Sequence, residues 1–210
     1  MTDRIIKTIK AFNASALTFQ EKFMDVSSYR DSLDYFIAQI EDGARVVELG
    51  CGPGNITKYL YEKNSTLKIR GIDLSEEMIK LAGCNVPQAE FEVKDIRKLD
   101  FRAGSCDAIV AAFCFPFIDN SEAAELVKKI AESLKKNGIV YLSTMEGSGS
   151  GYEKTSFCKT HDFYFNYYTK DFLQEEFAAN NLDLLKLFEQ PYSNDDGTVM
   201  NDLIYILRKN

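Results

Sequence analysis

The sequence has a single histidine, no C-x-x-C pair of cysteines and no long apolar run. Its five cysteines are odd in number, so the sequence predicts neither a disulfide framework nor a zinc knuckle, and we expect no metal. No stretch reaches the roughly 18 apolar residues of a membrane span, and the N-terminus lacks the apolar centre of a signal peptide. We therefore expect a cytoplasmic protein with reduced thiols and no membrane partner.

Positive charge is also scarce. The chain carries 25 Lys and Arg against 32 Asp and Glu, a formal net charge of −7, which repels a phosphate backbone. The pairs Lys128–Lys129 and Lys135–Lys136 are expected late in one helix, where they complement the helix dipole. These observations disfavour a nucleic-acid partner. Composition marks no boundary within residues 1–210, so we expect a single domain.

Residues 1–43 are expected to form an N-terminal helical cap. Apolar residues recur at mostly helical intervals over 3–23, which predicts a first helix. A second helix is expected to begin at Ser28, which together with Asp31 has the form of a capping box.

Residues 44–145 alternate between strand and helix patterns. Strands are expected at 44–50, 67–74, 89–95, 106–115 and 139–145, with helices at 55–64, 75–83 and 121–138. Ser75 is expected to cap the helix at 75–83. Strands separated by helices form right-handed crossovers and a parallel sheet that is covered on both faces. The pattern therefore predicts a doubly wound α/β fold.

The last part of the chain departs from this alternation. Residues 146–168 are rich in aromatics and show no clear period, and we expect them to form an aromatic cover segment. Residues 169–210 are expected to hold a helix and two strands, and the connection between those strands is too short for a helical crossover. The complete prediction is a seven-stranded, mostly parallel sheet with an antiparallel last strand.

A glycine-rich turn follows the first strand of this sheet, with Gly50, Gly52 and Gly54 in the spacing G-x-G-x-G. Ligands of open α/β sheets bind beyond the carboxyl ends of the strands, and this turn lies there. The dinucleotide fingerprint would need a third glycine at position 55, which is asparagine. The spacing therefore makes pyrophosphate binding less favoured without excluding it.

Acidic residues are predicted at three successive strand ends: Glu48, Asp73 and Asp95. A carboxylate in the position of Asp73 can accept hydrogen bonds from both ribose hydroxyls, which implies an adenosine moiety. Asp95 falls within reach of an adenine amine. Acids around such a cleft suit a cationic or zwitterionic ligand.

These residues resemble the class I S-adenosylmethionine-dependent methyltransferases, whose motifs match "VVELGCGPGN", "GIDLSEEMI", "FEVKDIRKL" and "CDAIVAAFCFPFI" in order and spacing. The resemblance covers residues 44–145, as the cofactor-binding core, and implies a Rossmann-like methyltransferase fold with S-adenosyl-L-methionine as cofactor. The cofactor-binding residues that it implies are Gly50, Cys51, Gly52, Asp73, Leu74, Met78, Asp95, Ile96 and Phe113. Two further candidates come from their position: Glu48 at a strand end, and Tyr29 on the second helix, which would close the cleft over the cofactor carboxylate.

The resemblance also implies where each group contacts the cofactor. Gly50 to Gly52 would line the methionine part, Asp73 the ribose, and Leu74 with Met78 the adenine face. Asp95 with Ile96 would contact the adenine edge, and Phe113 would border the methionyl group. Structural alternatives stay open: Leu74 and Met78 would also suit the core. Glu48 would also suit a role in orienting the turn, and Asp95 one in capping the following loop.

Methyl transfer from a sulfonium is an in-line displacement, in which the enzyme mainly positions donor and acceptor. His161 is the candidate base, although a lone histidine in a loop is more often a surface or packing residue. Phe115, Phe117 and Tyr164 are candidate substrate contacts. The two-proline tetrapeptide of amino-methylating nucleic-acid enzymes is absent after the fourth strand.

We therefore predict a methyltransferase that uses S-adenosylmethionine and acts on the oxygen or nitrogen of a small molecule. Two alternatives stay open: a nicotinamide-dinucleotide oxidoreductase, and a cofactor-binding module without catalysis. The sequence is compatible with a monomer or a homodimer.

Overall fold

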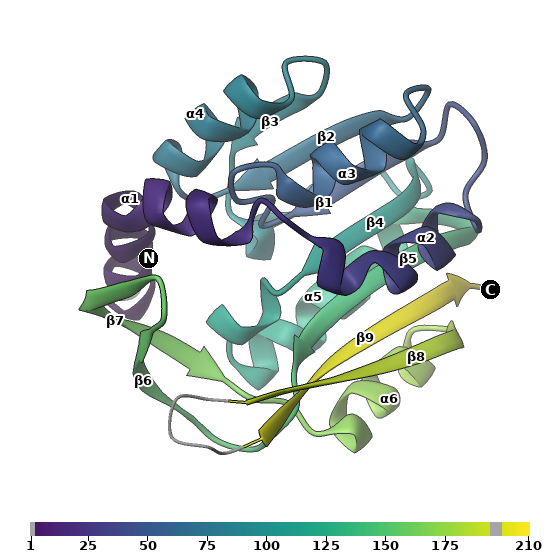
Figure 1. Ribbon diagram of the computed structural model, residues 1–210. Helices are drawn as coiled ribbons and strands as arrows, with labels where there is room; N and C mark the ends of the chain where they lie inside the picture. Colours follow the sequence, from purple (N-terminus) through teal and green to yellow (C-terminus); the bar gives the residue numbers. More distant parts are fainter. Residues whose placement is uncertain (1–2, 194–198) are drawn as a thin grey trace.

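The computed structural model describes residues 3–193 and 199–210. Its centre is a seven-stranded sheet with the order β3-β2-β1-β4-β5-β9-β8 (Figure 1). The strands are β1 (Arg45–Leu49), β2 (Lys68–Asp73), β3 (Glu90–Val93), β4 (Cys106–Ala112), β5 (Leu134–Met145), β8 (Leu182–Ser193) and β9 (Val199–Lys209). The pairs among β1 to β5 are parallel, whereas β9 is antiparallel to both β5 and β8. The predicted sheet with an antiparallel last strand is confirmed.

Helices cover both faces of the sheet. They are α1 (Asp3–Phe23), α2 (Arg30–Ile37), α3 (Asn55–Lys63), α4 (Glu76–Asn85), α5 (Asn120–Ser133) and α6 (Lys170–Ala179), with short 3-10 helices η1 (Ser27–Tyr29), η2 (Ile96–Lys98) and η3 (Phe115–Phe117). One hydrophobic cluster joins α2 and α3 to the sheet, on the near side in Figure 1. A second cluster joins α5 and α6 to it. The core therefore consists of two layers, one on each face of the sheet.

Side-chain caps fix the start of several helices. The Ser75 hydroxyl accepts a hydrogen bond from the Met78 amide at the start of α4, as the sequence predicts. Asp119 and Glu122 form a capping box at the start of α5. The predicted box of Ser28 and Asp31 is wrong, because Ser28 lies inside η1 and α2 begins only at Arg30 without a side-chain cap.

The helix predicted at 121–138 is too long. Helix α5 ends at Ser133, and β5 begins at Leu134, which is buried and pairs with Cys106 of β4. Lys135 therefore lies in a strand and forms an ion pair with Asp107, so it does not complement the dipole of α5. Burial of Leu134 beside β4 outweighs the helix propensity of the residues that follow it.

The sequence assigns no secondary structure to residues 146–168, which are expected to form an aromatic cover segment or a satellite hydrophobic cluster against the N-terminal helices. These residues form a two-stranded antiparallel sheet of β6 (Ser150–Thr155) and β7 (Cys158–Asn166), beside α1 in Figure 1. Phe163 of β7 is fully buried, and its ring lies 4.9 Å from that of Phe12 on α1. Contact with α1 thus gives this hairpin its own small hydrophobic cluster, separate from the two layers of the main core.

Candidate functional site

The glycine turn between β1 and α3 approaches the end of β4 closely. Gly50 has a φ of +65°, and a Cβ there would lie 2.7 Å from the Cβ of Cys114. At Gly52, with a φ of +52°, a Cβ would meet only the ring of Phe19, at 3.7 Å. Gly50 is therefore required by packing, whereas at Gly52 a Cβ would make an ordinary contact with Phe19, so the left-handed φ is what favours glycine there.

Asp73 connects this turn to the end of β2. Its carboxylate accepts hydrogen bonds from the Gly52 amide at 3.0 Å and from the Ser75 amide at 2.8 Å. Burial raises the pKa of the Asp73 carboxyl, and these amides oppose the increase. Because a carboxylate offers about four acceptor positions, Asp73 can hold the turn and still accept a ribose hydroxyl.

Glu48 lies on β1 directly below the turn and is 1% exposed. It accepts a hydrogen bond from the Thr57 hydroxyl on α3. Burial, with a contribution from the nearby Asp73, raises the pKa of Glu48 to about 8, so its carboxyl is mostly protonated at neutral pH. Glu48 therefore joins β1 to α3, and its contact with a ligand stays a prediction.

Asp95, at the end of β3, is held by a cation. It caps η2 through the Arg97 amide at 3.0 Å and binds the Arg97 guanidinium, whose Nη1 reaches Glu122 at 2.8 Å. Burial acts to raise the pKa of Asp95, but Arg97 holds it below its ordinary value. The capping alternative is thus confirmed, and the adenine contact stays a prediction.

The other implied adenine contacts differ in exposure. Met78 is 2% exposed and lies in the interior, which agrees with the core alternative. Leu74 and Ile96 are half-buried, and Ile96 packs against the cluster beneath α5. Cys51 is buried in the turn, and burial, with Asp73 and Glu48, raises the pKa of its thiol.

Tyr29 and Phe113 come together at the ends of η1 and β4. Their ring centroids lie 5.4 Å apart, and Phe113 adopts a left-handed φ of 51°. The Tyr29 hydroxyl donates a hydrogen bond of 2.8 Å to Asp202 on β9. The structure therefore brings these two predicted residues together and adds a carboxylate that the sequence did not indicate.

Helix α1 lies against the turn and the start of α4. The side-chain oxygen of Asn13 accepts a hydrogen bond of 2.6 Å from the Ser75 hydroxyl, and Asn55 donates one of 3.0 Å to the Phe23 carbonyl. With Phe19 facing Gly52, α1 borders the same sheet edge as the glycine turn.

The predicted substrate contacts do not form one group. Phe115 is fully buried in the core beneath α5, so its prediction as a substrate contact is wrong for this conformation. Phe117 packs on Phe12, with ring centroids 5.0 Å apart. Tyr164 lies beneath Arg4 and lines a cavity of about 440 Å³ between β7 and the start of α5.

His161 lies on the exposed side of β7. Its Nδ1 is 2.9 Å from the Thr160 hydroxyl and 3.6 Å from the Cys158 sulfur. Among the described residues its hydrogen bonds are therefore local to the hairpin, and its role as a base stays a prediction without structural support.

Four partners in this region could not be read from the sequence. Thr57, Arg97, Asn13 and Asp202 each complete a contact of a predicted residue. Thr57 and Arg97 carry local signals, since Thr57 is a hydroxyl in the first turn of the helix after the glycines and Arg97 lies two positions from Asp95. Asn13 and Asp202 lie 62 and 173 positions from their partners, so only the folded chain brings them together.

Comparison with known proteins identifies the family. A family model described as a methyltransferase domain matches residues 46–138, which include the glycine turn and the ends of β2, β3 and β4. Residues 46–138 match the methyltransferase domain of the class I S-adenosylmethionine-dependent methyltransferases. The cofactor of these methyltransferases is S-adenosyl-L-methionine.

Individual methyltransferases show the extent of the likeness. A trans-aconitate 2-methyltransferase of Variovorax paradoxus is 35% identical over 48% of this chain and 38% of its own length. An uncharacterized methyltransferase of Anoxybacillus flavithermus is 29% identical over 69% of this chain and 67% of its own. This chain spans half or less of the length of several curated relatives.

A solved methyltransferase structure shares the fold. The 1,6-didemethyltoxoflavin-N1-methyltransferase of Burkholderia thailandensis superposes with a TM-score of 0.73 at 17% identity. The match covers 100% of this chain and 92% of that one.

The residues at the sheet edge fit this methyltransferase cofactor. Glu48 and Asp73 are carboxyl groups with raised pKa values, and neither pairs with a cation among the described residues. Carboxyl groups without a paired cation suit a ligand that brings positive charge.

The described residues contain no group of three or more His, Cys, Asp or Glu side chains that could bind a metal ion. None of their helices has the length and apolar character needed to span a bilayer.

Proposed function

We propose that this chain transfers a methyl group from S-adenosyl-L-methionine to an oxygen or nitrogen atom of a small molecule. The observation that carries the proposal is the bond from the Gly52 amide to Asp73, which joins the glycine turn to the end of β2. Residues 44–145 act as the cofactor-binding core. Tyr29, Cys51, Leu74, Ile96 and Phe113 are proposed to contact the cofactor around this pair.

The residues of the chain perform the reaction mainly by positioning. When bound, the cofactor supplies a methyl group that is already activated on a sulfonium. Asp73 and Gly52 hold the ligand against β1, while Phe19 on α1 excludes water from the turn. Positioning of this kind can contribute roughly 7–11 kcal/mol to lowering the barrier.

A small acceptor is supported by charge and by the relatives. The net charge of −7 disfavours a phosphate backbone as partner. Trans-aconitate and 1,6-didemethyltoxoflavin, named for two of the proteins compared above, are small molecules. We also propose a cytoplasmic location, since all five cysteines are unpaired.

Calorimetric titration with S-adenosylhomocysteine tests the cofactor site. The wild-type protein should bind it, and Asp73→Asn should weaken binding because the amide has one acceptor oxygen where the carboxylate has two. Asp183→Asn, an exposed change on β8, is the matched control and should bind as wild type does. Unchanged affinity in Asp73→Asn would contradict the proposed site.

The same titration separates the alternatives. Saturation by NAD, without binding of S-adenosylhomocysteine, would indicate an oxidoreductase. Binding of S-adenosylhomocysteine without methyl transfer to any small acceptor would indicate a non-catalytic module.

A further inference from the structure

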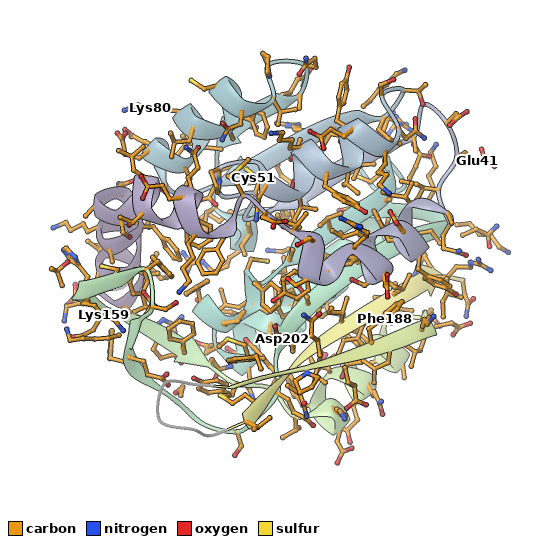
Figure 2. The ribbon with its side chains drawn as sticks, viewed as in Figure 1. Glu41, Cys51, Lys80, Lys159, Phe188 and Asp202 are labelled. Atoms are coloured by element: carbon orange, nitrogen blue, oxygen red, sulfur yellow. The ribbon has the colours of Figure 1, made fainter. Side chains whose placement is uncertain are left out.

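A buried carboxylate from the far end of the sequence lies at the proposed reaction edge. Asp202 is on β9 and pairs with Met145, the last residue of β5. Because β9 is antiparallel, its beginning lies at the edge where the parallel strands end. In Figure 2, Asp202 lies in the middle of the view, far from Lys159 on the outer hairpin.

The surroundings of Asp202 leave its charge uncompensated. The residue is 5% exposed, and its hydrogen-bond partner among the described residues is the Tyr29 hydroxyl. The titratable groups that act on it or feel its charge are Tyr29, Tyr141 and Tyr192, all phenols. Burial raises the pKa of Asp202 to about 6, and the Tyr29 bond opposes this.

A chain of contacts connects Asp202 to the end of β4. The Tyr29 ring that holds the carboxylate also packs on Phe113. The Phe113 amide donates hydrogen bonds to the Ser143 carbonyl, at 3.0 Å, and to its hydroxyl, at 3.2 Å. Phe113 is the residue expected to border the methionyl group, so the Tyr29–Asp202 pair lies next to the expected place of methyl transfer.

A buried carboxylate without a cation lowers stability, and a structural role alone does not explain it. A phenol donating to a neutral amide would hold β9 and η1 together without burying a charge. The ionised form of Asp202 is instead suited to accepting a proton at neutral pH.

We propose that Asp202, oriented by Tyr29, accepts the proton of the methyl acceptor, which is therefore a neutral or cationic compound with an N–H or O–H group and not a carboxylate. This inference rests on the proposed function. It separates the chain from its relative named for trans-aconitate, since Asp202 would repel an anionic acceptor.

The step balances in charge and atoms. A bond forms between the acceptor nitrogen or oxygen and the methyl carbon as the bond from that carbon to sulfur breaks, and its electron pair stays on sulfur. The proton on the acceptor atom moves to the Asp202 carboxylate. Asp202 then releases the proton to water, which restores the base.

The test uses the full chain and a panel of small N-heterocycles, phenols, amines and carboxylic acids with radiolabelled S-adenosylmethionine. Wild type should methylate N–H or O–H compounds, with a rate that rises with pH through about 6. Asp202→Asn should lower kcat by about 10²-fold to 10⁴-fold and abolish this acidic limb. Asp183→Asn on the neighbouring strand β8 is the matched control.

Tyr29→Phe provides a second variant. It keeps the ring on Phe113 but removes the hydrogen bond that lowers the pKa of Asp202, so the acidic limb should move to higher pH. A readout without turnover is carbon-13 NMR of the Asp202 carboxyl in the complex with S-adenosylhomocysteine, which should titrate near pH 6.

Several results would overturn the inference while leaving the proposed function intact. They are full kcat and an unchanged acidic limb in Asp202→Asn, or methylation of carboxylic acids alone. Binding of S-adenosylhomocysteine with no transfer to any compound of the panel would instead refute both the inference and the proposed methyl transfer. Loss of S-adenosylhomocysteine affinity in Asp202→Asn would make Asp202 a cofactor contact and would also refute its role as the base. Failure of wild type to bind S-adenosylhomocysteine would refute the proposed function itself.

Discussion

Replacing Glu48 by glutamine should make the protein more stable at neutral pH. Glu48 is 1% exposed on β1, and the Thr57 hydroxyl donates to its carboxyl. Glutamine has nearly the same shape and keeps an oxygen that accepts from Thr57. The change therefore removes a titrating group while preserving the packing between β1 and α3.

The pKa values give the size of the effect. Burial raises the pKa of Glu48 from its ordinary 4.5 to about 8, so the folded protein holds a proton that the unfolded chain releases above pH 4.5. The contribution of Glu48 to the free energy of unfolding is therefore fully present below pH 4.5 and is lost as the pH rises to 8. At pH 7 the loss covers about 2.5 pH units, or roughly 3 kcal/mol. Glutamine does not titrate and is free of this loss.

Urea unfolding of wild type and Glu48→Gln at about pH 5 and pH 7 measures the effect. The stability of the variant relative to wild type should rise by roughly 2.5 kcal/mol between these conditions. Any cost of burying the amide is the same at both pH values and cancels from this difference. Glu62→Gln, an exposed change on α3, should show no comparable rise.

An equal stability difference at both pH values would refute the reasoning. It would mean that Glu48 keeps an ordinary pKa in the folded protein, because water or another group stabilises its carboxylate. A fall in the relative stability of the variant at pH 7 would mean that the carboxylate is stabilised by positive charge.

Two further changes test the packing of the core. Gly50→Ala should lower the free energy of unfolding by about 2–4 kcal/mol, because its Cβ would meet the Cβ of Cys114 at 2.7 Å. Gly104→Ala is the control, since Gly104 has a similar φ and open space around it, and it should cost about 1 kcal/mol in the same urea unfolding experiment. Tyr168→Phe should cost about 1–3 kcal/mol in thermal or urea unfolding, because the buried Tyr168 hydroxyl satisfies the carbonyls of Phe115 at 2.9 Å and Ile118 at 2.7 Å. The exposed Tyr152→Phe is its control, and equal effects in the two tyrosine variants would show that these bonds contribute nothing.

The parts of the site that were predictable from the sequence depend on local chemistry. Ser75 caps α4 through an amide three residues away, and Asp73 reaches the turn because neighbouring parallel strands end at one edge. Both relations follow from spacing along the chain and from the alternation of strands and helices.

The parts that were missed depend on contacts between distant elements. Strand β7 lacks strict alternation of buried and exposed residues, because α1 contacts only some of its side chains, so no period of two marks it as a strand. The partnership of Tyr29 with Asp202 spans 173 positions and has no local signature. Similarly, Phe115 was expected at the end of the fourth strand, but β4 ends at Ala112 and the Phe115 side chain packs in the core beneath α5.

The carboxyl groups at the sheet edge fall into two electrostatic classes, and this division supports their different roles. Asp95 is paired with Arg97, which holds its pKa low and fixes the loop after β3. Glu48, Asp73 and Asp202 pair with no cation in residues 3–193 and 199–210, and burial raises the pKa of each. Arginine is available nearby, since Arg97 and Arg4 both reach Glu122, yet it pairs with the outer carboxylates. The inner edge therefore holds acidic groups without a paired cation, whose ionised forms a positively charged ligand would stabilise, and Asp202 keeps the capacity to take up a proton.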